Sequence, residues 1–595
     1  MGKHIRVFMP YILPGLGILS LAVFGALTQN IYFLYALIIG VCVVVGLVAF
    51  DKFSEKHYPY LLFAIGLALL YQTTLMSAGL VGTDIHTEYY FYQLSASNGW
   101  DPSQTHAYNS CIGTVIIAPF IAKVLHIDGV WVFKAIYPFL FSFVPVLLYY
   151  VFRKQVGAKM AFLATFFFLI VPTWSLEMIG LPRQMLAELM LALCLFFIVV
   201  SRWRLQITIP LILVCAILGL LFHYAMGSII IIYLVFGAAF LLLFKRRTLP
   251  VKWLSLVAVI VLIVGFGYYG LVGQGFPLYD WSDNLKAQVL RIMPKAEVPT
   301  STEGVTLPGA SSTSLFAGQE PLVQTALGLD LLEASPDGKA FRVLQFLTQG
   351  CIVLGCGYLV WNRKKYSPEF LAFAGVSAVL IGACIFIPGF SAMLNVSRFY
   401  HIALFLLAPA LVLGGKVIFR NLKILTLCLL IPYFLFTSGC VFEAIKVKDI
   451  SYVNIPYSIA LSHERVEVGG VFTKNDMMAR DWAVDHASGP IYADVYGVLL
   501  LAEKMPITLN ASWTGWDTNY LLLSSLGVPD GAYIFLRERN EQRHEITIMP
   551  ENPTGSVTGM RVTYGYSGFG LDKMLVGRAI IHREGDAVIY GKRRA

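Results

Sequence analysis

The chain has 595 residues, of which 57% are hydrophobic and only 13% are charged. A mean hydropathy of +0.70 excludes an ordinary soluble enzyme and predicts an integral membrane protein. The formal net charge is +9, but Lys and Arg fall mostly between apolar runs, where they set membrane topology, so we exclude nucleic-acid binding. The nine cysteines are scattered without a CxxC pair or a Cys/His cluster, which argues against disulfides and cysteine-bound metal.

About thirteen apolar runs approach the length that crosses the hydrocarbon of a bilayer, which predicts a multi-span α-helical membrane protein. The first run follows a basic N-terminus without a small-residue cleavage signal, so we expect a retained span that also targets the protein to the membrane. The predicted spans are residues 9–28, 31–50, 59–79, 131–152, 160–175, 184–201, 207–222, 224–244, 251–272, 343–361, 370–388, 399–415 and 424–440.

Basic residues in the connections predict which way the spans run. With a cytoplasmic N-terminus, and with the short apolar run 112–125 at the interface instead of crossing, every short basic loop falls inside, as the positive-inside rule requires. A span at 112–125 would invert all later loops and place most basic clusters outside. The residues placed inside are Lys52, Lys56, Arg153, Lys154, Lys159, Arg202, Arg204, Lys245, Arg246, Arg247, Lys252, Arg363, Lys364, Lys365, Lys416, Arg420 and Lys423.

This topology predicts a multi-pass plasma-membrane protein with a membrane domain at 1–442 and three extracytoplasmic segments. Residues 80–130 form a first external loop with interfacial helices. Residues 273–342 are polar and partly rich in Ser, Thr, Gly and Pro, a composition typical of a lid or a mobile loop. Residues 443–595 combine short alternating strand patterns with a helix at 475–486, which predicts a small extracytoplasmic α/β domain.

The first external loop opens with three ionisable residues, Asp84, His86 and Glu88, in the sequence GTDIHTEYYFY. In a helix, Asp84 and Glu88 lie one turn apart on the same face. The tyrosines and phenylalanine that follow are typical of a membrane interface. Ordinary solvated acids are the simpler interpretation, but a cluster directly after a span and among aromatic residues favours a site.

Further ionisable side chains fall at the same predicted outer face. They are Lys134, Glu177, Arg183, His223, Arg398 and His401, with Glu188 about one turn deeper. Such groups cost a few kcal/mol each at membrane depth unless they are paired or face water, so their convergence predicts one cavity that opens outward. Each also has a simpler explanation. Arg398 can reach lipid headgroups, His223 can be a satisfied interface histidine, and Glu188 can pair with Arg183 to join two helices.

Carboxylates beside cations at the outer leaflet suit transfer from a lipid-linked phosphate donor. The predicted ligands of a polyprenyl phosphate or pyrophosphate are Lys134, Arg183, His223, Arg398 and His401, supported by Glu177 and Glu188. Asp84 is predicted to deprotonate the acceptor hydroxyl, with Glu88 as its rival and His86 as a third candidate. A divalent cation, Mg or Mn, held by the same three residues is an open alternative, although D-x-H-x-E is no established metal-site spacing.

Four stretches carry a resemblance to a family of predicted prokaryotic membrane proteins of unassigned function, common in archaea. They are GTDIHTEYYFY, WVFKAIYPFLFSFVPVLLYY, LPRQMLAEL and SRFYHIALFLLAPALVLGG. An early external loop with an acid just beyond a span, interfacial helices and a C-terminal extracytoplasmic domain also resembles the GT-C superfamily of glycosyltransferases. These enzymes use polyprenyl-phosphate-linked sugars, and the resemblance implies that Asp84 occupies the position of their catalytic acid.

The chain departs from the GT-C pattern at three points. The acids are separated as D-I-H-T-E instead of forming a DD, DE or ExD pair, which leaves Asp84 and Glu88 both open as the base. The catalytic loop follows the third predicted span, so extra N-terminal helices are implied. The sequence WTGWD at 513–517 lacks the adjacent tryptophans of the oligosaccharyltransferase WWD motif, which favours transfer of a single sugar.

Our first hypothesis is therefore an inverting glycosyltransferase at the outer membrane face, with a polyprenyl-phosphate sugar donor and a glycan, lipid or protein acceptor. A transporter or flippase of a lipid-linked glycan would bind the same phosphate without cleaving a bond, and its charges are expected through the bilayer midplane. A surface-polysaccharide polymerase or ligase would use outer-face arginines and a histidine without an essential first-loop acid. A non-catalytic assembly scaffold is the remaining alternative. The gathering of charges at one face favours the enzyme.

Overall fold

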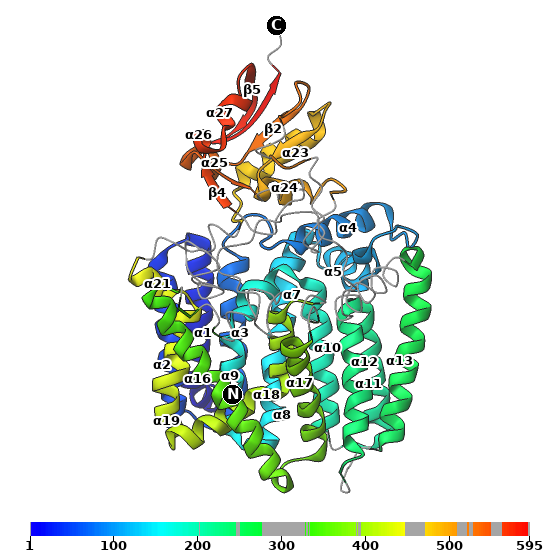
Figure 1. The fold of residues 1–595 in the computed structure, drawn as a ribbon, viewed down its shortest axis with the longest axis vertical. Helices are drawn as coiled ribbons and strands as arrows, with labels where there is room; N and C mark the ends of the chain where they lie inside the picture. Colours follow the sequence, from blue (N-terminus) through cyan, green and yellow to red (C-terminus); the bar gives the residue numbers. More distant parts are fainter. Residues whose placement is uncertain are drawn as a thin grey trace, which may run out of the picture.

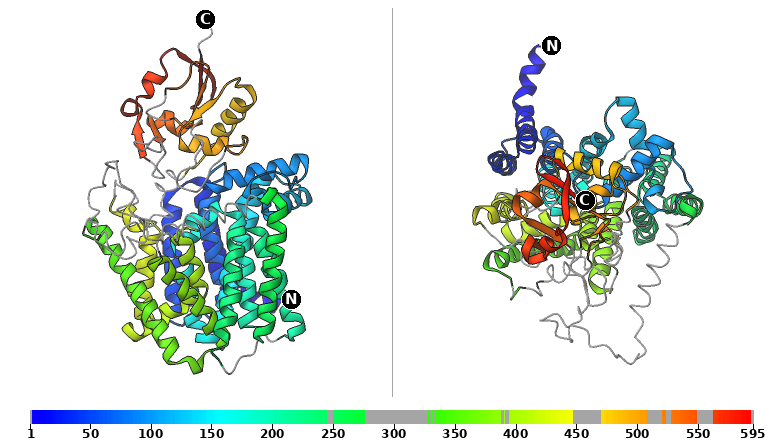
Figure 2. Two further views of the ribbon diagram at one scale, coloured as in Figure 1. Left: turned by 45° about the vertical axis from the view of Figure 1, so that its right-hand side comes forward. Right: turned by 90° about the horizontal axis from the view of Figure 1, so that it is seen from above.

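The computed structural model describes residues 2–201, 203–244, 250–275, 328, 331–332, 334–387, 390, 394–446, 470–507, 520–522, 527–548 and 562–592. Long helices stand side by side in a bundle, and a smaller α/β domain lies beyond one end of them (Figure 1). Seen from above, this domain lies over the helices (Figure 2). The predicted lid at 273–342 and the sequence at 513–517 fall largely or wholly outside the described residues.

The first part of the chain has three long helices before the predicted first external loop and further helices after it. Its elements are α1 (Gly2–Thr28), α2 (Ile31–Ala49), η1 (Glu55–His57), α3 (Tyr58–Thr74), α4 (Asp84–Asn98), η2 (Ala107–Ser110), η3 (Gly113–Ile117), α5 (Ala118–Leu125), α6 (Gly129–Trp131), η4 (Val132–Ile136), α7 (Tyr137–Phe141), α8 (Val144–Val156), α9 (Ala158–Leu169), η5 (Thr173–Glu177), η6 (Met178–Gly180) and α10 (Pro182–Val199).

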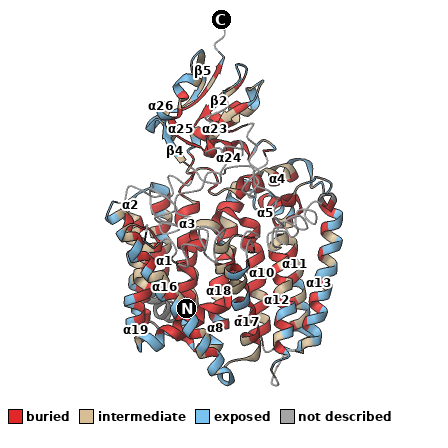
Figure 3. Ribbon diagram, viewed as in Figure 1, coloured by how far each residue is buried: buried red, intermediate tan, exposed pale blue. Residues whose placement is uncertain are grey.

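The second part of the bundle consists mainly of long apolar helices. Its elements are α11 (Leu205–Phe222), α12 (Tyr224–Leu241), α13 (Val251–Leu271), η7 (Val272–Gly275), α16 (Pro336–Trp361), η8 (Arg363–Lys365), α17 (Pro368–Phe386), α18 (Val396–Phe419), α19 (Leu422–Leu425), η10 (Thr426–Leu430), α20 (Ile431–Thr437) and α21 (Cys440–Ala444). The helix α18 is buried along most of its length, whereas α13 and α16 at the periphery expose one side (Figure 3).

The prediction of a multi-span helical protein is confirmed, but with fewer spans than expected. Within the described residues, nine helical segments are long and apolar enough to cross a membrane, and the bent pair Ala158–Leu169 with Thr173–Gly180 raises the number to ten. The other predicted runs are also helical. The run 9–28 lies within α1, a helix of 27 residues, whereas Leu422–Thr437 is an apolar helix of 10–17 residues and α3 has 17 residues and ends at Thr74. Gly113–Leu125 is likewise short, and its α5 part contacts α4 and α6, as expected of an interfacial segment.

Three of the connections predicted for the cytoplasm meet at one end of the bundle, opposite the α/β domain (Figure 1). Lys159 forms an ion pair with Asp51 at 2.9 Å, which joins the start of α9, directly after the turn that follows α8, to the loop after α2. Gln155 Oε1 accepts a hydrogen bond from the Ser367 backbone N–H at 3.0 Å, which adds the loop after α16. These loops therefore share a side, as the positive-inside pattern predicts. The assignment of that side to the cytoplasm stays a prediction.

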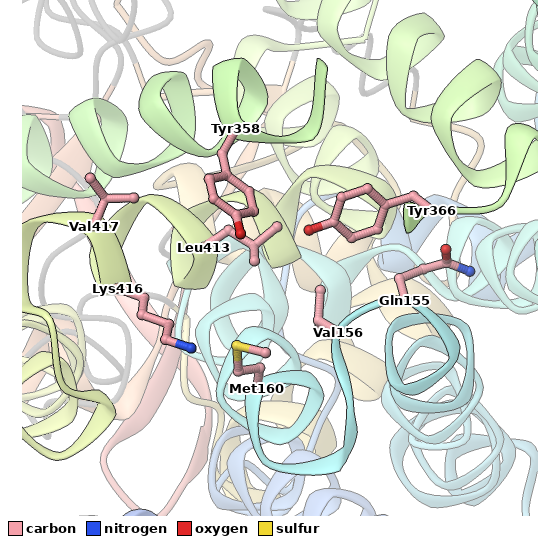
Figure 4. A pocket seen from close by; sticks show the side chains of 8 residues that line it. All are labelled: Gln155, Val156, Met160, Tyr358, Tyr366, Leu413, Lys416 and Val417. Atoms are coloured by element: carbon pink, nitrogen blue, oxygen red, sulfur yellow. The ribbon is translucent and has the colours of Figure 1, made fainter. Parts of the chain in front are cut away.

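A cavity of about 340 Å³ opens at this same end, between α8, α9, α16 and α18. Its walls include the side chains of Tyr358, Tyr366 and Lys416, whose polar ends point toward its centre (Figure 4). The predicted site residues lie at the other end of these helices, so this cavity takes no part in the site described below.

The helices α16 and α18 cross with their backbones in contact. A Cβ atom added at Gly355 would lie 1.8 Å from the Ala410 carbonyl oxygen, and one added at Gly414 would lie 1.9 Å from the Cys351 carbonyl oxygen. Small residues permit such close helix packing, which in lipid depends on van der Waals contact more than on the hydrophobic effect. The crossing therefore holds α18, which carries Arg398, in the middle of the bundle.

The C-terminal region is a small α/β domain, as its alternating patterns predict. Its elements are α23 (Lys474–His486), β1 (Ile491–Ala493), α24 (Val495–Leu501), β2 (Tyr533–Leu536), α25 (Glu538–Arg543), β3 (Glu545–Ile548), β4 (Val562–Gly565), α26 (Tyr566–Phe569), α27 (Leu571–Met574), β5 (Arg578–Glu584) and β6 (Ala587–Lys592). The main sheet has the order β1-β2-β6-β5, with β1 parallel to β2 and the other pairs antiparallel. The strands β3 and β4 form a separate antiparallel pair.

Candidate functional site

The helix that carries the first-loop acids is held close to the start of α10. Gly82, with φ of +131°, lies so near Gly180 that a Cβ atom at Gly82 would be 2.5 Å from the Gly180 Cα. Glycine tolerates both this positive φ and this backbone approach. Gly180 ends η6, and Pro182 begins α10 two residues later. The contact therefore brings the first turn of α4 beside the first turn of α10.

Arg183 joins the two acids of α4 in a buried group that we call the Arg183 cluster (Asp84, Glu88 and Arg183). Its Nη1 donates to Glu88 Oε1 at 2.6 Å, and its Nη2 donates to Asp84 Oδ2 at 2.8 Å. Its backbone N–H and the Thr114 hydroxyl donate to Glu88 Oε2 at 3.2 and 3.4 Å. The three side chains of the cluster are at most 5% exposed. The predicted one-turn spacing thus places both acids on one face of a helix.

The Arg183 cluster sets two acids against one cation away from water. Burial raises the pKa of Glu88 to about 7; the Arg183 guanidinium opposes this rise, and the Asp84 carboxylate adds to it. The guanidinium carbon lies 3.7 Å from the centre of the Tyr108 ring, a cation–π contact that sequence reasoning missed. Glu88 is therefore poised to exchange a proton near neutral pH.

Four other predicted residues form a second group, the Arg398 cluster, made of Glu177, Glu188, Arg398 and His401. Arg398 Nε lies 3.6 Å from Glu177 Oε2, which also accepts a hydrogen bond from the Ser397 hydroxyl at 2.9 Å. One turn along α18, His401 Nε2 lies 3.2 Å from Glu188 Oε2, and both side chains are fully buried. The alternative pairing of Glu188 with Arg183 does not form. Five residues apart on α10, the two side chains point about 140° apart.

His223 feels the positive charge of both clusters, from Arg183 in one and from Arg398 in the other. Burial lowers its pKa well below the ordinary value, and the positive charges of Arg183 and Arg398 both lower it further. Its Nδ1 accepts hydrogen bonds from two backbone N–H groups in the first turn of α12, at 3.1 and 3.4 Å. His223 is thus a neutral helix cap whose Nε2 carries the ring proton.

Lys134 contacts backbone carbonyl groups instead of the clusters. Its ammonium donates to the Ser77 carbonyl oxygen and, at 3.3 Å, to the Ala78 carbonyl oxygen, both in the segment between α3 and α4. It also lies 5.5 Å from the centre of the Trp131 ring. This environment favours a structural role over the predicted phosphate contact.

His86 points away from the two acids on its own helix. Its Nδ1 lies 2.8 Å from Glu503 Oε1, in the turn after α24 of the C-terminal domain. His86 therefore does not converge with Asp84 and Glu88 on one point, as the alternative of a divalent cation held by all three would require. More widely, no group of three or more His, Cys, Asp or Glu side chains suited to a metal ion occurs among the described residues.

Several buried polar atoms in this region have no hydrogen-bond partner among the described residues. They are Glu177 Oε1, Arg183 Nε, Gln184 Oε1, His223 Nε2, Arg398 Nε and His401 Nδ1. Buried polar atoms nearly always bond to protein, water or ligand. These atoms therefore mark where a polar molecule is expected to bind.

Sequence reasoning also missed residues that complete the site. Gln184 donates from Nε2 to Glu188 Oε1 at 2.8 Å and so links the start of α10 to the Arg398 cluster. Tyr108 lies in the same loop as the acids, but tyrosines are common there and nothing distinguished it. Glu503 lies 417 residues after His86, and no local pattern connects them.

Comparison with curated proteins returned no match. Among solved structures, the chain is similar to the apo form of the Archaeoglobus fulgidus oligosaccharyltransferase, at 15% identity and a TM-score of 0.44, over 75% of this chain and 64% of that one. It is similar to AglB of the same organism in complex with an inhibitory peptide and a dolichol-phosphate, at 15% identity and a TM-score of 0.43, over 74% and 59%. It is also similar to ArnT from Cupriavidus metallidurans in the apo state, at 12% identity and a TM-score of 0.45, over 90% and 98%.

These are GT-C enzymes, and the likeness to them is distant. The chain spans less than two thirds of the two Archaeoglobus structures. A match with a protein family covers the last membrane helices and the C-terminal domain, and it confirms the predicted resemblance to a family of membrane proteins. Over residues 331–590 the chain matches the family described as "Predicted membrane protein (DUF2206)".

Proposed function

We propose that the chain is an inverting glycosyltransferase that takes a sugar from a polyprenyl-phosphate donor at the outer face of the plasma membrane. The acceptor is a hydroxyl group of a glycan, a lipid or a protein. The observation that carries this proposal is the Arg183 cluster. It combines paired carboxylates with a cation, and buried polar atoms without partners among the described residues lie around it.

Asp84 is the base in this mechanism. Only its Oδ2 is bonded to Arg183, and Oδ1 has no partner in the described part of the chain, whereas both oxygens of Glu88 are bonded. Asp84 is also the more accessible acid, at 5% exposed against 0% for Glu88. The acceptor oxygen attacks the anomeric carbon of the sugar opposite the phosphate, so the configuration inverts, while Asp84 takes the hydroxyl proton.

Arg398 is the cation most open to the donor phosphate. Its side chain is 19% exposed, and its Nε has no hydrogen-bond partner among the described residues, although Glu177 lies nearby. The Nε groups of Arg183 and Arg398 and the Nε2 group of His223 stabilise the charge that develops on the leaving phosphate. Lys134 is left out of this role because its ammonium already bonds to carbonyl groups.

The distribution of charge supports an enzyme over a transporter or flippase. Asp84, Arg183 and Arg398 lie in the first turns of α4, α10 and α18, and the pair Glu188 with His401 lies about one turn further along α10 and α18. A transporter is expected to bind its cargo near the bilayer midplane between broken helices of two repeats. A polymerase or ligase differs by needing no essential acid in the first loop.

Transfer assays with the purified chain test the proposal. Wild type is incubated with a panel of labelled polyprenyl-phosphate sugars and mixed acceptors, beside Asp84→Asn, Arg398→Ala and the matched control Asp101→Asn, an exposed acid in the same loop. Loss of a general base is expected to lower turnover about 10²- to 10⁴-fold in Asp84→Asn, with little change in the control. Failure of wild type to cleave any donor, or full turnover by Asp84→Asn, would refute the mechanism.

The predicted orientation has its own test. Ser97→Cys lies at the exposed end of α4 and Lys364→Cys lies in the loop after α16 at the opposite end. A membrane-impermeant maleimide is expected to label Ser97→Cys on intact cells above the wild-type background, and Lys364→Cys only after lysis. The reverse pattern would place the site on the cytoplasmic side.

A further inference from the structure

The helix α4 presents different chemistry on two opposite faces. At about 100° per residue, His86 and Gln93 lie roughly 180° and 160° from the midpoint of Asp84 and Glu88. The face with the acids contacts Arg183 at the start of α10. The other face contacts the C-terminal domain. The position of Asp84 and Glu88 therefore depends on the contacts that the C-terminal domain makes with the opposite face of α4.

A single residue of the C-terminal domain contacts that second face twice. His86 Nδ1 donates to Glu503 Oε1 at 2.8 Å, and Gln93 Nε2 donates to the Glu503 backbone carbonyl oxygen at 2.7 Å. Arg480, from α23, donates to the other carboxylate oxygen of Glu503. The His86, Arg480 and Glu503 side chains are at most 3% exposed. These contacts form a buried joint between two parts of the chain.

Glu503 is charged in this joint although it is buried. Burial alone would raise its pKa, but the hydrogen bonds and charges of His86 and Arg480 hold it below the ordinary value. A buried carboxylate without its hydrogen-bond donors has a high free energy. Movement of α4 away from the domain would remove the His86 donor from Glu503 and is therefore energetically unfavourable.

A second contact fixes the chain just before α4. The Phe472 backbone N–H donates to the Ser77 hydroxyl at 2.9 Å, and the Ala78 backbone N–H donates to the Phe472 carbonyl oxygen at 2.8 Å. The Phe472 ring meets the His86 ring edge-on, with centroids 5.6 Å apart. The domain thus holds both the segment that enters α4 and the middle of its first turns.

We propose that His86 and Glu503 are positioning residues, through which the C-terminal domain holds the acids of α4 in register with Arg183. This inference rests on the proposed function and assigns His86 a role different from the base that its sequence position suggests. His86 does not touch substrate; it acts through the helix that carries Asp84. The C-terminal domain is thereby a part of the transferase machinery and not an appendage.

Two substitutions of His86 separate positioning from catalysis. In His86→Asn the amide nitrogen takes nearly the place of Nδ1 and still donates to Glu503, whereas His86→Leu removes the donor and keeps the bulk. Misplaced acids are expected to lower kcat of His86→Leu about 10- to 100-fold with little change in donor KM. His86→Asn is expected to keep kcat near wild type. Equal loss of kcat in both variants would show direct catalysis by the imidazole and overturn the proposal.

Hydrogen–deuterium exchange of the full-length protein gives a readout that does not depend on sugar transfer. The backbone amides of Asp84–Asn98 are expected to exchange about tenfold faster in His86→Leu than in wild type, because the helix loses a buried anchor. The matched control Glu538→Gln changes an acid of the same domain that bonds to Asn475 and the Asp586 backbone, not to α4. It is expected to leave this exchange unchanged.

Unchanged exchange of α4 in His86→Leu would overturn the positioning role even if the transferase reaction is established. Faster exchange in a protein that transfers no sugar would instead refute the proposed function and leave the anchoring of α4 intact. The two hypotheses therefore fail on different measurements.

Discussion

Replacement of Glu88 by Gln is expected to remove a pH dependence of the protein's stability. The carboxyl group of Glu88 has a pKa of about 7 in the folded chain against an ordinary value of 4.5. Between these values the folded state keeps a proton that the unfolded state has released, so the free energy of unfolding falls as pH rises from about 4.5 to 7. The difference corresponds to about 3 kcal/mol. The Gln side chain does not titrate, so the free energy of unfolding of the variant does not fall in this way as pH rises.

The measurement is unfolding of wild type and Glu88→Gln in mixed detergent micelles between pH 5 and pH 8.5, followed by tryptophan fluorescence. We expect the variant to gain about 2.5 kcal/mol relative to wild type between the two ends of this range, because at pH 5 the unfolded carboxyl group is already largely ionised. The control Asp101→Asn, whose acid is exposed, is expected to follow the wild-type slope. Parallel pH curves for wild type and Glu88→Gln would refute the proposed burial of two acids against one cation.

Three further substitutions test the packing of the site and the bundle. Arg183→Met leaves two acids buried without their cation and is expected to cost about 3–5 kcal/mol, measured by the same unfolding assay. Gly82→Ala places a methyl group against Gly180 at a positive φ and is expected to lower both the melting temperature and sugar transfer. Gly414→Ala places a methyl group against the Cys351 carbonyl oxygen, so it is expected to separate α16 from α18 and to lower the melting temperature. The control Gly357→Ala has open space around the new methyl group and is expected to melt at the wild-type temperature.

Hydropathy predicted the helices well, and the distribution of basic residues predicted which loops lie at the same end of the bundle, because both properties can be read from local composition. Lys159 at the start of α9 meets the loop with Asp51, as a count of basic residues indicated. The strand patterns of the C-terminal region were likewise confirmed. The predicted spans 59–79 and 424–440 were overestimated because apolar composition does not reveal where a helix stops, as α3 does at Thr74.

The choice of partners in the site was less predictable. Helix geometry alone places Asp84 and Glu88 on one face of α4 and His86 on the opposite face, so the separation of His86 from the acids was predictable from the spacing. The partners of these groups come from tertiary packing. Arg183 lies 99 residues after Asp84. Nothing in the sequence around Arg183 shows whether this arginine pairs with acids of the chain or binds a phosphate.

The joint between His86 and Glu503 also sets an order of assembly during synthesis. At about 5–20 residues per second, Arg183 follows Asp84 after about 5–20 s. Glu503 follows His86 by 417 residues, or about 20–80 s. The acids thus meet their cation while most of the bundle is still being made, and the helix that bears them gains its second anchor only near the end of translation. A nascent chain that stops before Glu503 is expected to be inserted in the membrane but idle, so that sugar transfer begins only when the protein is nearly complete.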